Sequence, residues 1–462
     1  MWHPGDLDPA DGTRTEQVAA LISRRIERGD LAIGSRLPGE RALAERLGVS
    51  RVTVVRALDL LRGEGALSTR HGAGSQVLPL DRWADPVAPL STVQRSADAA
   101  TGGDGWPLID LRHATTAAPH EVAAAVARLQ QGALAEAMTG DGPPRGGSLV
   151  LRERLADRLT ADGTATDPAQ LTLTTGAASA LEALVAGVDH ASGTVLTETP
   201  TYPAALDIFR RHGLEVVGWP AGAHGWDVDQ LAHLCRRHRP GLVYLQADNH
   251  NPTGLSLPTD RRAPVVAEVL RAGALLVSDE TLRPLWLQDT PQAAPLSAHP
   301  KVVGIGSLSK TVWGGLRVGW IRSSRLQRRR VLESAPPGLL SPGAVDELLA
   351  GELMGLAGQV TERRRGLLRA NLAGLEEALA TLPDVAWTTP TGGMTLWLEL
   401  LADRPRQLVA RARRAGLLLS HAELFTPDQA SRQHLRIPFT AQRDTLAGAV
   451  ARLAELMGGP GR

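Results

Sequence analysis

The sequence predicts a chain of two folded parts, a small helical domain ending in a β-hairpin and a larger α/β domain built on a mostly parallel sheet. Three short helical patterns followed by a glycine-containing ribbon indicate the first part, at residues 14–78. From residue 108 to residue 462, apolar β-like runs alternate with helical stretches rich in Ala, Leu and Arg, the pattern of a sheet between helices. Residues 79–107 are rich in Pro, Ala, Asp and Gly without any period, which predicts a linker.

Composition excludes several classes of protein. Hydrophobic residues make up 43% of the chain, but no apolar run approaches the roughly 18 residues that a transmembrane helix needs. The first residues lack the basic-then-apolar order of a signal peptide. The single cysteine, Cys235, leaves no intrachain disulfide, and the histidines are too dispersed for a metal site. We therefore expect a cytoplasmic protein without a metal.

Lysine is rare in this chain. Of the 50 basic residues only Lys301 and Lys310 are lysines, so arginine is used wherever a positive charge is enough. Only an amine that can lose its proton forms a Schiff base, and a guanidinium group cannot. Lys310 is therefore a candidate for covalent chemistry.

The small domain has the element order of a winged helix. TEQVAALISRRIERG carries apolar residues at helical spacing, and a second short helix follows between Pro38 and Gly48. Ser50 is a good N-cap for a third helix, RVTVVRALDLLRGEG. ALSTRHGAGSQV then predicts two short strands around a turn. Helix, helix–turn–helix and hairpin in this order are typical of a winged helix.

The segments RLPGERALAERLGVSRVTVVRALDLLRGEGAL and RHGAGSQV resemble the winged-helix domain of the GntR family. That family usually has Ser where Gly39 stands, so we expect a weaker cap on the second helix. The resemblance implies DNA as a partner, and arginine is well suited to guanine edges and phosphates. The residues implied to face double-stranded DNA are Arg51, Thr53 and Arg56, with His71 and Gly72 at the wing tip. The alternative is a surface helix pair whose arginines are merely solvated.

Five apolar runs of the larger part each end in a polar or glycine cluster. In an open α/β sheet, ligands bind beyond the carboxyl ends of the strands, where all five clusters would meet. The runs and the clusters that follow them are LTLT with TGAAS, TVLT with ETPTYP, LVYLQ with ADNHNPTG, ALLVS with Asp279, and VVGIG with SLSK.

The chemistry of these clusters predicts the kind of ligand. Lys310 offers an amine, and Asp279 can pair with a protonated pyridine nitrogen. Tyr202 can stack on a ring, and Asn251 can donate to a phenolate oxygen. A helix N-terminus with polar neighbours can hold a phosphate group. The candidates for that role are Gly176, Ala177, Ala178, Ser307, Ser309 and Arg317. Together these groups describe pyridoxal 5'-phosphate.

Roughly residues 108–455 resemble the fold-type I aminotransferases, through TTGAASALEAL, ETPTYP, NHNPTG, SDET and SLSKTVWGGLRVGW. The resemblance implies a large domain at about 130–325, with a smaller C-terminal α+β domain from about 340 that also takes the N-terminal part. It implies that Lys310 is the Schiff-base lysine, Asp279 the pyridine-nitrogen partner and Asn251 the amide to the ring oxygen. Ser307 and Arg317 resemble phosphate ligands, and Arg436, in HLRIPFT, resembles the arginine that grips a substrate carboxylate.

Structural alternatives stay open at several of these positions. Asp279 could be a strand-end cap, Tyr202 a core aromatic residue, Ser309 a structural hydroxyl and Arg436 an ion-pair partner. One departure from the family is clear, because aminotransferases commonly carry a tyrosine where this chain has Leu282. The missing phenol leaves cofactor binding intact but puts efficient transamination in doubt.

A GntR-like winged helix followed by an aminotransferase-like domain is the arrangement of the MocR subfamily, which the chain resembles over nearly its whole length. The resemblance implies a transcription regulator that senses pyridoxal phosphate or an amino compound through an imine on Lys310. It also implies a head-to-tail homodimer. The alternative is an active aminotransferase acting on an amino acid, with the DNA-binding domain secondary.

Overall fold

The computed structural model describes most of the chain, and its described residues form two compact units. The first unit is Met1–Asp110 with Asp403–Leu418 and Glu455–Arg462, and the second is Leu111–Ala402 with Leu419–Ala454. The residues described are 2–27, 30–31, 35–63, 67–70, 74–77, 108–129, 132–187, 193–222, 225–401, 405–427 and 433–457. The predicted linker at 79–107 lies outside them.

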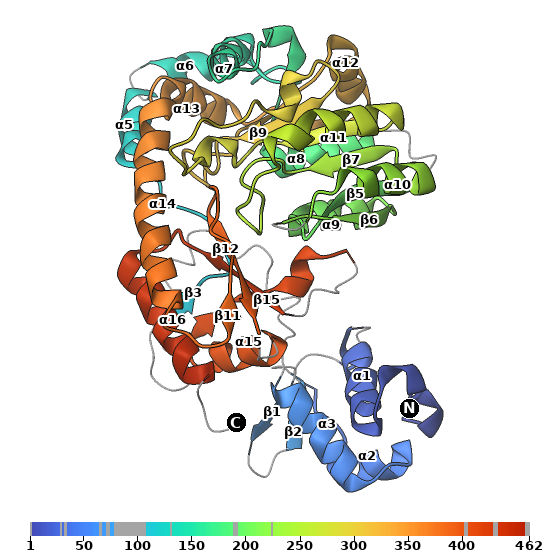
Figure 1. Cartoon of the computed structure of the whole chain (residues 1–462). Helices are drawn as coiled ribbons and strands as arrows, with labels where there is room; N and C mark the ends of the chain where they lie inside the picture. The colour runs from blue at the N-terminus through green and yellow to red at the C-terminus, as the bar shows by residue number, and fades with distance from the viewer. Residues whose placement is uncertain are drawn as a thin grey trace. The chain divides into compact units, whose positions relative to one another are not determined.

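The first unit contains the helices and hairpin expected of a winged helix (Figure 1). Its elements are α1 (Arg14–Glu27), α2 (Glu40–Leu47), α3 (Arg51–Gly63), β1 (Leu67–Arg70) and β2 (Gly74–Val77). β1 and β2 pair antiparallel, and α1, α2 and α3 pack around a shared apolar core. The unit also holds α15 (Pro405–Arg414) and a parallel pair formed by β3 (Ile109–Asp110) and β13 (Leu417–Leu418).

The helix ends of this unit follow the local sequence. The Oγ atom of Ser50 accepts a hydrogen bond from the Thr53 backbone N–H at 3.1 Å, which is the capping interaction expected of a serine before a helix. Gly39 is the N-cap of α2 and supplies no side-chain bond, as the sequence predicted. Gly48 ends α2 with φ +63°, a left-handed conformation that glycine adopts without strain.

A seven-stranded sheet forms the centre of the second unit (Figure 1). Its strands lie in the order β4, β10, β9, β8, β7, β5, β6. β10 runs antiparallel to both of its neighbours, and the other pairs are parallel. The strands are β4 (Leu171–Thr174), β5 (Thr194–Thr199), β6 (Glu215–Pro220), β7 (Leu242–Leu245), β8 (Leu275–Asp279), β9 (Val303–Ser307) and β10 (Gly319–Arg322). The five predicted runs therefore form β4, β5, β7, β8 and β9.

Helices cover both faces of this sheet because successive strand residues point to opposite sides. Tyr244 and Val277 pack in one cluster with α8 (Ala177–Ala186), α9 (Pro203–Arg211) and α12 (Arg325–Ser334). Their neighbours Val243 and Leu276 pack in another cluster with α10 (Val228–His238) and α11 (Thr259–Arg271). A third cluster joins β4 to α5 (His120–Leu129), α7 (Leu149–Ala161) and α13 (Ala344–Met354). The short α6 (Ala133–Ala137) contacts α13.

A smaller antiparallel sheet in the same unit has the order β11, β12, β15, β14. These strands are β11 (Val385–Ala386), β12 (Thr395–Leu400), β14 (Ser420–His421) and β15 (His434–Pro438). The long helix α14 (Ala357–Leu379) connects the two sheets: Arg364 donates to the Val312 carbonyl, and Asn371 donates to the carbonyl of Phe439, which directly follows β15 (Figure 1). The last helix is α16 (Arg443–Met457). In the part of the chain that the structure describes, no helix is both long enough and apolar enough to cross a bilayer.

Candidate cofactor site and DNA-binding surface

The five polar clusters meet at one edge of the seven-stranded sheet. β4, β5, β7, β8 and β9 all run in the same direction, since β4 is separated from β9 only by the antiparallel β10. Their carboxyl ends therefore share an edge, and the segments that follow them lie side by side there. This confirms the arrangement expected from the sequence.

Lys310 lies three residues after β9, at this edge. Its Nζ atom donates to the Ala114 carbonyl oxygen at 2.8 Å. Burial disfavours the charged ammonium form, and the nearby cations Arg436 and Arg317 disfavour it further, while Asp279 favours it. The sum lowers the pKa of Lys310 from 10.5 to about 8. An amine in this state is neutral far more often than an exposed lysine at physiological pH.

Asp279 is the last residue of β8 and is buried. One carboxylate oxygen, Oδ2, accepts a hydrogen bond from the Tyr244 hydroxyl at 2.7 Å. The other, Oδ1, accepts from the Thr281 backbone N–H at 3.0 Å. The two bonds fix the orientation of the carboxylate from both sides. Sequence analysis did not single out Tyr244, which lies on β7 beside β8.

Asn251 and Tyr202 also lie at the strand ends. Asn251 is buried, and its Oδ1 atom has no hydrogen-bond partner among the described residues. Tyr202 is the N-cap residue of α9 and packs against the core cluster beneath it. Burial raises the pKa of the Tyr202 phenol, and the negative charge of Asp279 raises it further. Tyr202 is thus close enough to Asp279 to respond to its charge.

The turn before α8 brings backbone N–H groups close to a guanidinium group. Gly176 is the N-cap of α8 and has φ +132°, which side-chain-bearing residues rarely adopt. A Cβ atom at Gly176 would lie 3.1 Å from Arg317 Nη2, so the turn and this cation are in contact. Ala177 and Ala178 are the first residues of α8, whose N-terminus favours an anion.

Strand β10 lies between the predicted Ser307 and the turn at Gly176, and it pairs with the strands that lead to both. Gly319 pairs with Ser307 on one side and with Thr174 on the other. Ser307 Oγ donates to the Val318 carbonyl oxygen at 3.0 Å and accepts from the Ser309 backbone N–H at 3.1 Å. Ser307 Oγ also lies 3.0 Å from Ser309 Oγ, so the two hydroxyl groups are adjacent, directly before Lys310.

Arg436 belongs to the smaller sheet, on β15, and is buried. Its guanidinium group lies 4.9 Å from the centroid of the Phe425 ring and donates to the Arg112 carbonyl oxygen. Its Nε atom has no hydrogen-bond partner among the described residues. Burial lowers the pKa of Arg436 to about 10. No acidic side chain of the described chain forms an ion pair with Arg436, which argues against the ion-pair alternative.

The third helix of the first unit presents the predicted DNA-facing side chains. Arg51 and Arg56 are exposed, and Arg51 forms an ion pair with Glu40 at 2.9 Å. Thr53 is half-buried, and its Oγ1 lies 2.8 Å from Ser50 Oγ. The opposite face of the helix carries the core residues. The predicted wing-tip residues His71 and Gly72 lie outside the described residues.

Comparison with known proteins identifies the larger part of the chain. Residues 110–453 match the family described as aminotransferase class I and II. The chain belongs to the aminotransferase class I and II family. Residues 14–77 match the bacterial regulatory proteins of the gntR family. A gntR-type helix–turn–helix domain fused to an aminotransferase domain is the MocR arrangement that the sequence predicted.

Individual relatives share one or both parts. The uncharacterized HTH-type transcriptional regulator YdfD of Bacillus subtilis is 25% identical over 94% of this chain and 94% of its own. The HTH-type pyridoxine biosynthesis transcriptional regulator PdxR of Corynebacterium glutamicum is 29% identical over 88% of this chain and 87% of its own. Among solved structures, the α-aminoadipate aminotransferase LysN of Thermus thermophilus, complexed with N-(5'-phosphopyridoxyl)-L-leucine, covers 76% of this chain and 92% of its own with a TM-score of 0.70 and 26% identity.

The residues of this aminotransferase-like unit fit pyridoxal phosphate, the cofactor that the family implies. The site offers an amine of lowered pKa, an oriented carboxylate, a buried amide and a glycine turn in contact with a cation. When bound, the cofactor supplies an aldehyde for an amine and an electron-accepting ring. Lys310 would hold the aldehyde carbon, Asp279 the ring nitrogen and the start of α8 the phosphate.

Leu282 leaves the aminotransferase-like site without the usual phenol. Its side chain is buried, and its backbone carbonyl accepts a hydrogen bond from Asn249 Nδ2 at 2.8 Å. The chain has two tyrosines, and neither takes over that position by sequence. Tyr244 is bonded to Asp279, and Tyr202 caps α9.

Sequence reasoning missed a buried polar cluster under the same strand ends. Glu198, on β5, accepts hydrogen bonds from the Gln246 backbone N–H at 2.6 Å and from Trp226 Nε1 at 3.1 Å. His250 Nε2 lies 3.6 Å from the same carboxylate. Burial raises the pKa of Glu198 to about 8 and lowers the pKa of His250 to about 3. The Glu in ETPTYP and the His in NHNPTG were the available signal, since charged residues are seldom buried without a partner.

Proposed function

We propose that this chain is a pyridoxal-phosphate-dependent, DNA-binding transcription regulator whose aminotransferase-like unit senses an amino compound. One observation carries the proposal: the same chain combines an exposed pair of arginines on a gntR-type helix with a lysine of lowered pKa among Asp279, Arg317 and Arg436. The first feature suits DNA, and the second suits an aldehyde cofactor. The name of PdxR, a pyridoxine biosynthesis regulator, supports the same combination.

The proposed roles follow from the positions of the side chains. Lys310 binds the cofactor, Asp279 pairs with its ring nitrogen and Asn251 donates to its ring oxygen. Tyr202 stacks on the ring. The start of α8 with Ser307, Ser309 and Arg317 binds the phosphate. Arg436 receives the carboxylate of an amino compound, because its buried guanidinium has an unused Nε donor and no acidic partner among the described residues.

Sensing requires that the amino compound bind two states of the protein unequally. A ligand shifts an equilibrium only by the difference between its affinities for the two states. We propose that the amino compound would compete with Lys310 for the aldehyde carbon of the cofactor, releasing the lysine amine, and would bind Arg436 through its carboxylate, and that this changes the affinity of the first unit for DNA. We propose that the chain forms a head-to-tail homodimer, as the resemblance to the MocR subfamily implies. The dimer would then place two copies of the first unit on the DNA.

The test begins by selecting a binding site from a random duplex library with the cofactor-loaded full chain. The affinity for that site is then measured by fluorescence anisotropy, with and without each of the common amino acids. A regulator of the proposed kind changes its affinity with at least one of them. Lys310→Ala should bind the same DNA and lose this response, because it lacks the amine.

A Lys310→Ala variant that still responds would show that sensing does not pass through this lysine. The rival function is tested in parallel by supplying an amino acid with a 2-oxo acid acceptor. Rapid multiple turnover with no effect on DNA binding would favour an active aminotransferase. Single-turnover conversion followed by arrest is the result expected with Leu282 in place of the phenol.

A further inference from the structure

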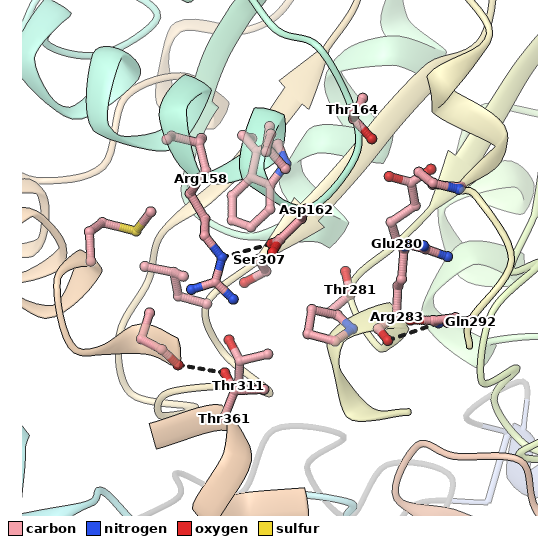
Figure 2. Close-up of a pocket in the computed structure, with 18 of the residues that line it drawn as sticks. Arg158, Asp162, Thr164, Glu280, Thr281, Arg283, Gln292, Ser307, Thr311 and Thr361 are labelled. Carbon is pink, nitrogen blue, oxygen red and sulfur yellow. Dashed lines mark hydrogen bonds and ion pairs between the residues drawn. The ribbon is translucent and has the colours of Figure 1, made fainter. Parts of the chain in front are cut away.

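A cavity of about 170 Å³ lies beside the segment that follows β9 (Figure 2). It is bounded by α7, the start of α14, and the segments that follow β8 and β9. Ser307, Leu308 and Thr311 line it, whereas Lys310 and Arg436 do not. It is therefore a separate space that shares a wall with the cofactor site.

Apolar side chains form part of the cavity wall. Leu155, Leu159, Leu308, Trp320 and Met354 contribute to its walls. An engineered apolar cavity of roughly 150 Å³ binds benzene in another protein. A single ring or a short alkyl chain is therefore the size of group that this volume accepts.

The polar part of the cavity is rich in unused hydrogen-bond donors. Arg158 bonds to Asp162 through Nε alone, at 2.7 Å, and its two Nη groups form no hydrogen bond among the described residues. Figure 2 shows its guanidinium group turned into the cavity. Arg365 uses Nε on the Pro284 carbonyl and Nη1 on Glu362, which leaves Nη2.

Thr281 is the second, independent sign of a ligand. Its side chain is 9% exposed and lines the cavity, and its hydroxyl has no hydrogen-bond partner in the described part of the chain. A buried hydroxyl without a partner is unfavourable, and a ligand that accepts a hydrogen bond from it removes that cost. Its backbone N–H donates to Asp279, which fixes the main chain at this residue.

Both acidic side chains of the cavity, by contrast, already accept hydrogen bonds. One Asp162 carboxylate oxygen accepts from Arg158, and both Glu280 oxygens accept from the backbone N–H and hydroxyl of Ser297. Three arginines and two acidic residues line the space, so its formal charge is positive. A ligand that satisfies the free donors must bring acceptors and a negative charge.

We propose that this cavity is a second ligand site, specific for a small carboxylate with an aryl or short alkyl body. The carboxylate binds Arg158 and the Thr281 hydroxyl, and the apolar body packs among the leucines and Met354. This site does not depend on the proposed regulatory function, because none of its residues belongs to the cofactor or DNA-binding positions except Ser307, whose hydroxyl is engaged with Val318.

The test uses phenylacetate as the probe and phenylacetamide, which has the same shape without the charge, as its control. Binding to the cofactor-loaded full chain is measured by saturation-transfer NMR titration. Because hydrogen bonds to charged groups are roughly twice as strong as neutral ones, phenylacetate should bind about tenfold more tightly than phenylacetamide. Equal affinities, or no binding of phenylacetate, would overturn the proposal.

Variants then locate the bound carboxylate. Arg158→Met keeps the apolar stem, removes the donors and should weaken phenylacetate binding by about tenfold or more, while Thr281→Val should weaken it about threefold. Arg154→Met, on the same helix but outside the cavity, is the matched control. Arg436→Met tests the rival position, the carboxylate-binding arginine of the cofactor site.

Loss of binding in Arg436→Met with full binding in Arg158→Met would place the carboxylate at the cofactor site and refute the inference. Asp162 is about half exposed, so losing its partner should not prevent folding, and a thermal melt checks this. If Arg158→Met does not fold, Leu159→Trp is used instead, because a larger side chain fills the cavity and should abolish phenylacetate binding.

Phenylacetate binding that survives both Leu159→Trp and Thr281→Val would equally exclude this cavity. Arg158→Met, Thr281→Val and Leu159→Trp should leave DNA binding unchanged, so this result is distinguishable from failure of the proposed function.

Discussion

Lys310 should react with an aldehyde at a pH where an ordinary lysine is almost entirely protonated. Its pKa is lowered from 10.5 to about 8, first by burial and then by Arg436 and Arg317. At pH 7.5 an amine of pKa 8 is neutral in roughly a quarter of molecules, against roughly one in a thousand for pKa 10.5. Only the neutral amine attacks an aldehyde, so the advantage is about two orders of magnitude in initial rate.

The assay mixes the cofactor-free chain with pyridoxal phosphate at several values between pH 6 and pH 10. Borohydride reduces the adduct at short times, and peptide mapping separates the two lysines, so the exposed Lys301 serves as an internal comparison. The initial rate at Lys310 should rise with pH and reach half its plateau near pH 8. A midpoint near 10.5, or equal labelling of both lysines at pH 7.5, would refute the reasoning.

Two variants test whether the neighbouring charges lower the pKa of Lys310, because each should move that pKa in a different direction. Arg436→Gln removes a cation that disfavours the ammonium form, so the midpoint should move to higher pH. Asp279→Asn removes the anion that favours the ammonium form, so the midpoint should move to lower pH. Shifts in the same direction would show that the charges around Lys310 do not set its pKa.

Three further changes have expected outcomes. Tyr244→Phe removes a buried donor to the Asp279 carboxylate and should cost about 1.5–3 kcal/mol in urea unfolding, with weaker cofactor retention on dialysis; unchanged values for both would exclude a positioning role. The double variant Arg51→Ala with Arg56→Ala should bind the selected DNA more weakly. In a plot of log affinity against log salt concentration, the magnitude of its slope should be smaller by about 2, and an unchanged slope would exclude phosphate contacts by these two arginines. Leu43→Ala, at a fully buried position of α2, should cost about 2–5 kcal/mol and unfold the first unit at a lower temperature, as measured by circular dichroism.

The sequence predicted strands best where both faces of the sheet are covered. β7 is a short continuous apolar run because helices pack on each side of it, and a run of this kind is visible in a single sequence. β4 is also buried along its whole length, although Leu alternates with Thr in it. β6 is an edge strand, and its alternating exposure with a terminal Pro220 produces a weaker pattern. β10 has four residues, one of them a glycine, and is recognisable only from its two antiparallel partners.

The residues of the candidate site that lie at strand ends could be predicted from the sequence. Contacts between side chains that are distant in the sequence could not be predicted. Lys310 and Asp279 follow apolar runs directly, so their shared edge follows from strand direction alone. The bond from Tyr244 to Asp279 depends on β7 lying next to β8 and on which face each side chain takes. The contact of Arg436 with the Arg112 carbonyl joins residues 324 positions apart, and nothing local indicates it.

Two backbone carbonyl groups, those of Arg112 and Ala114, accept hydrogen bonds from the side chains proposed to bind the cofactor and the amino compound. Arg436 donates to the first and Lys310 to the second. A compound that engages both Lys310 and Arg436 takes these two donors away from the carbonyls, and Ser420 Oγ, at 3.5 Å, remains as a donor to the Arg112 carbonyl. The backbone directly after β3 therefore competes with any such compound. Filling the site means releasing the stretch of main chain that continues from residue 110.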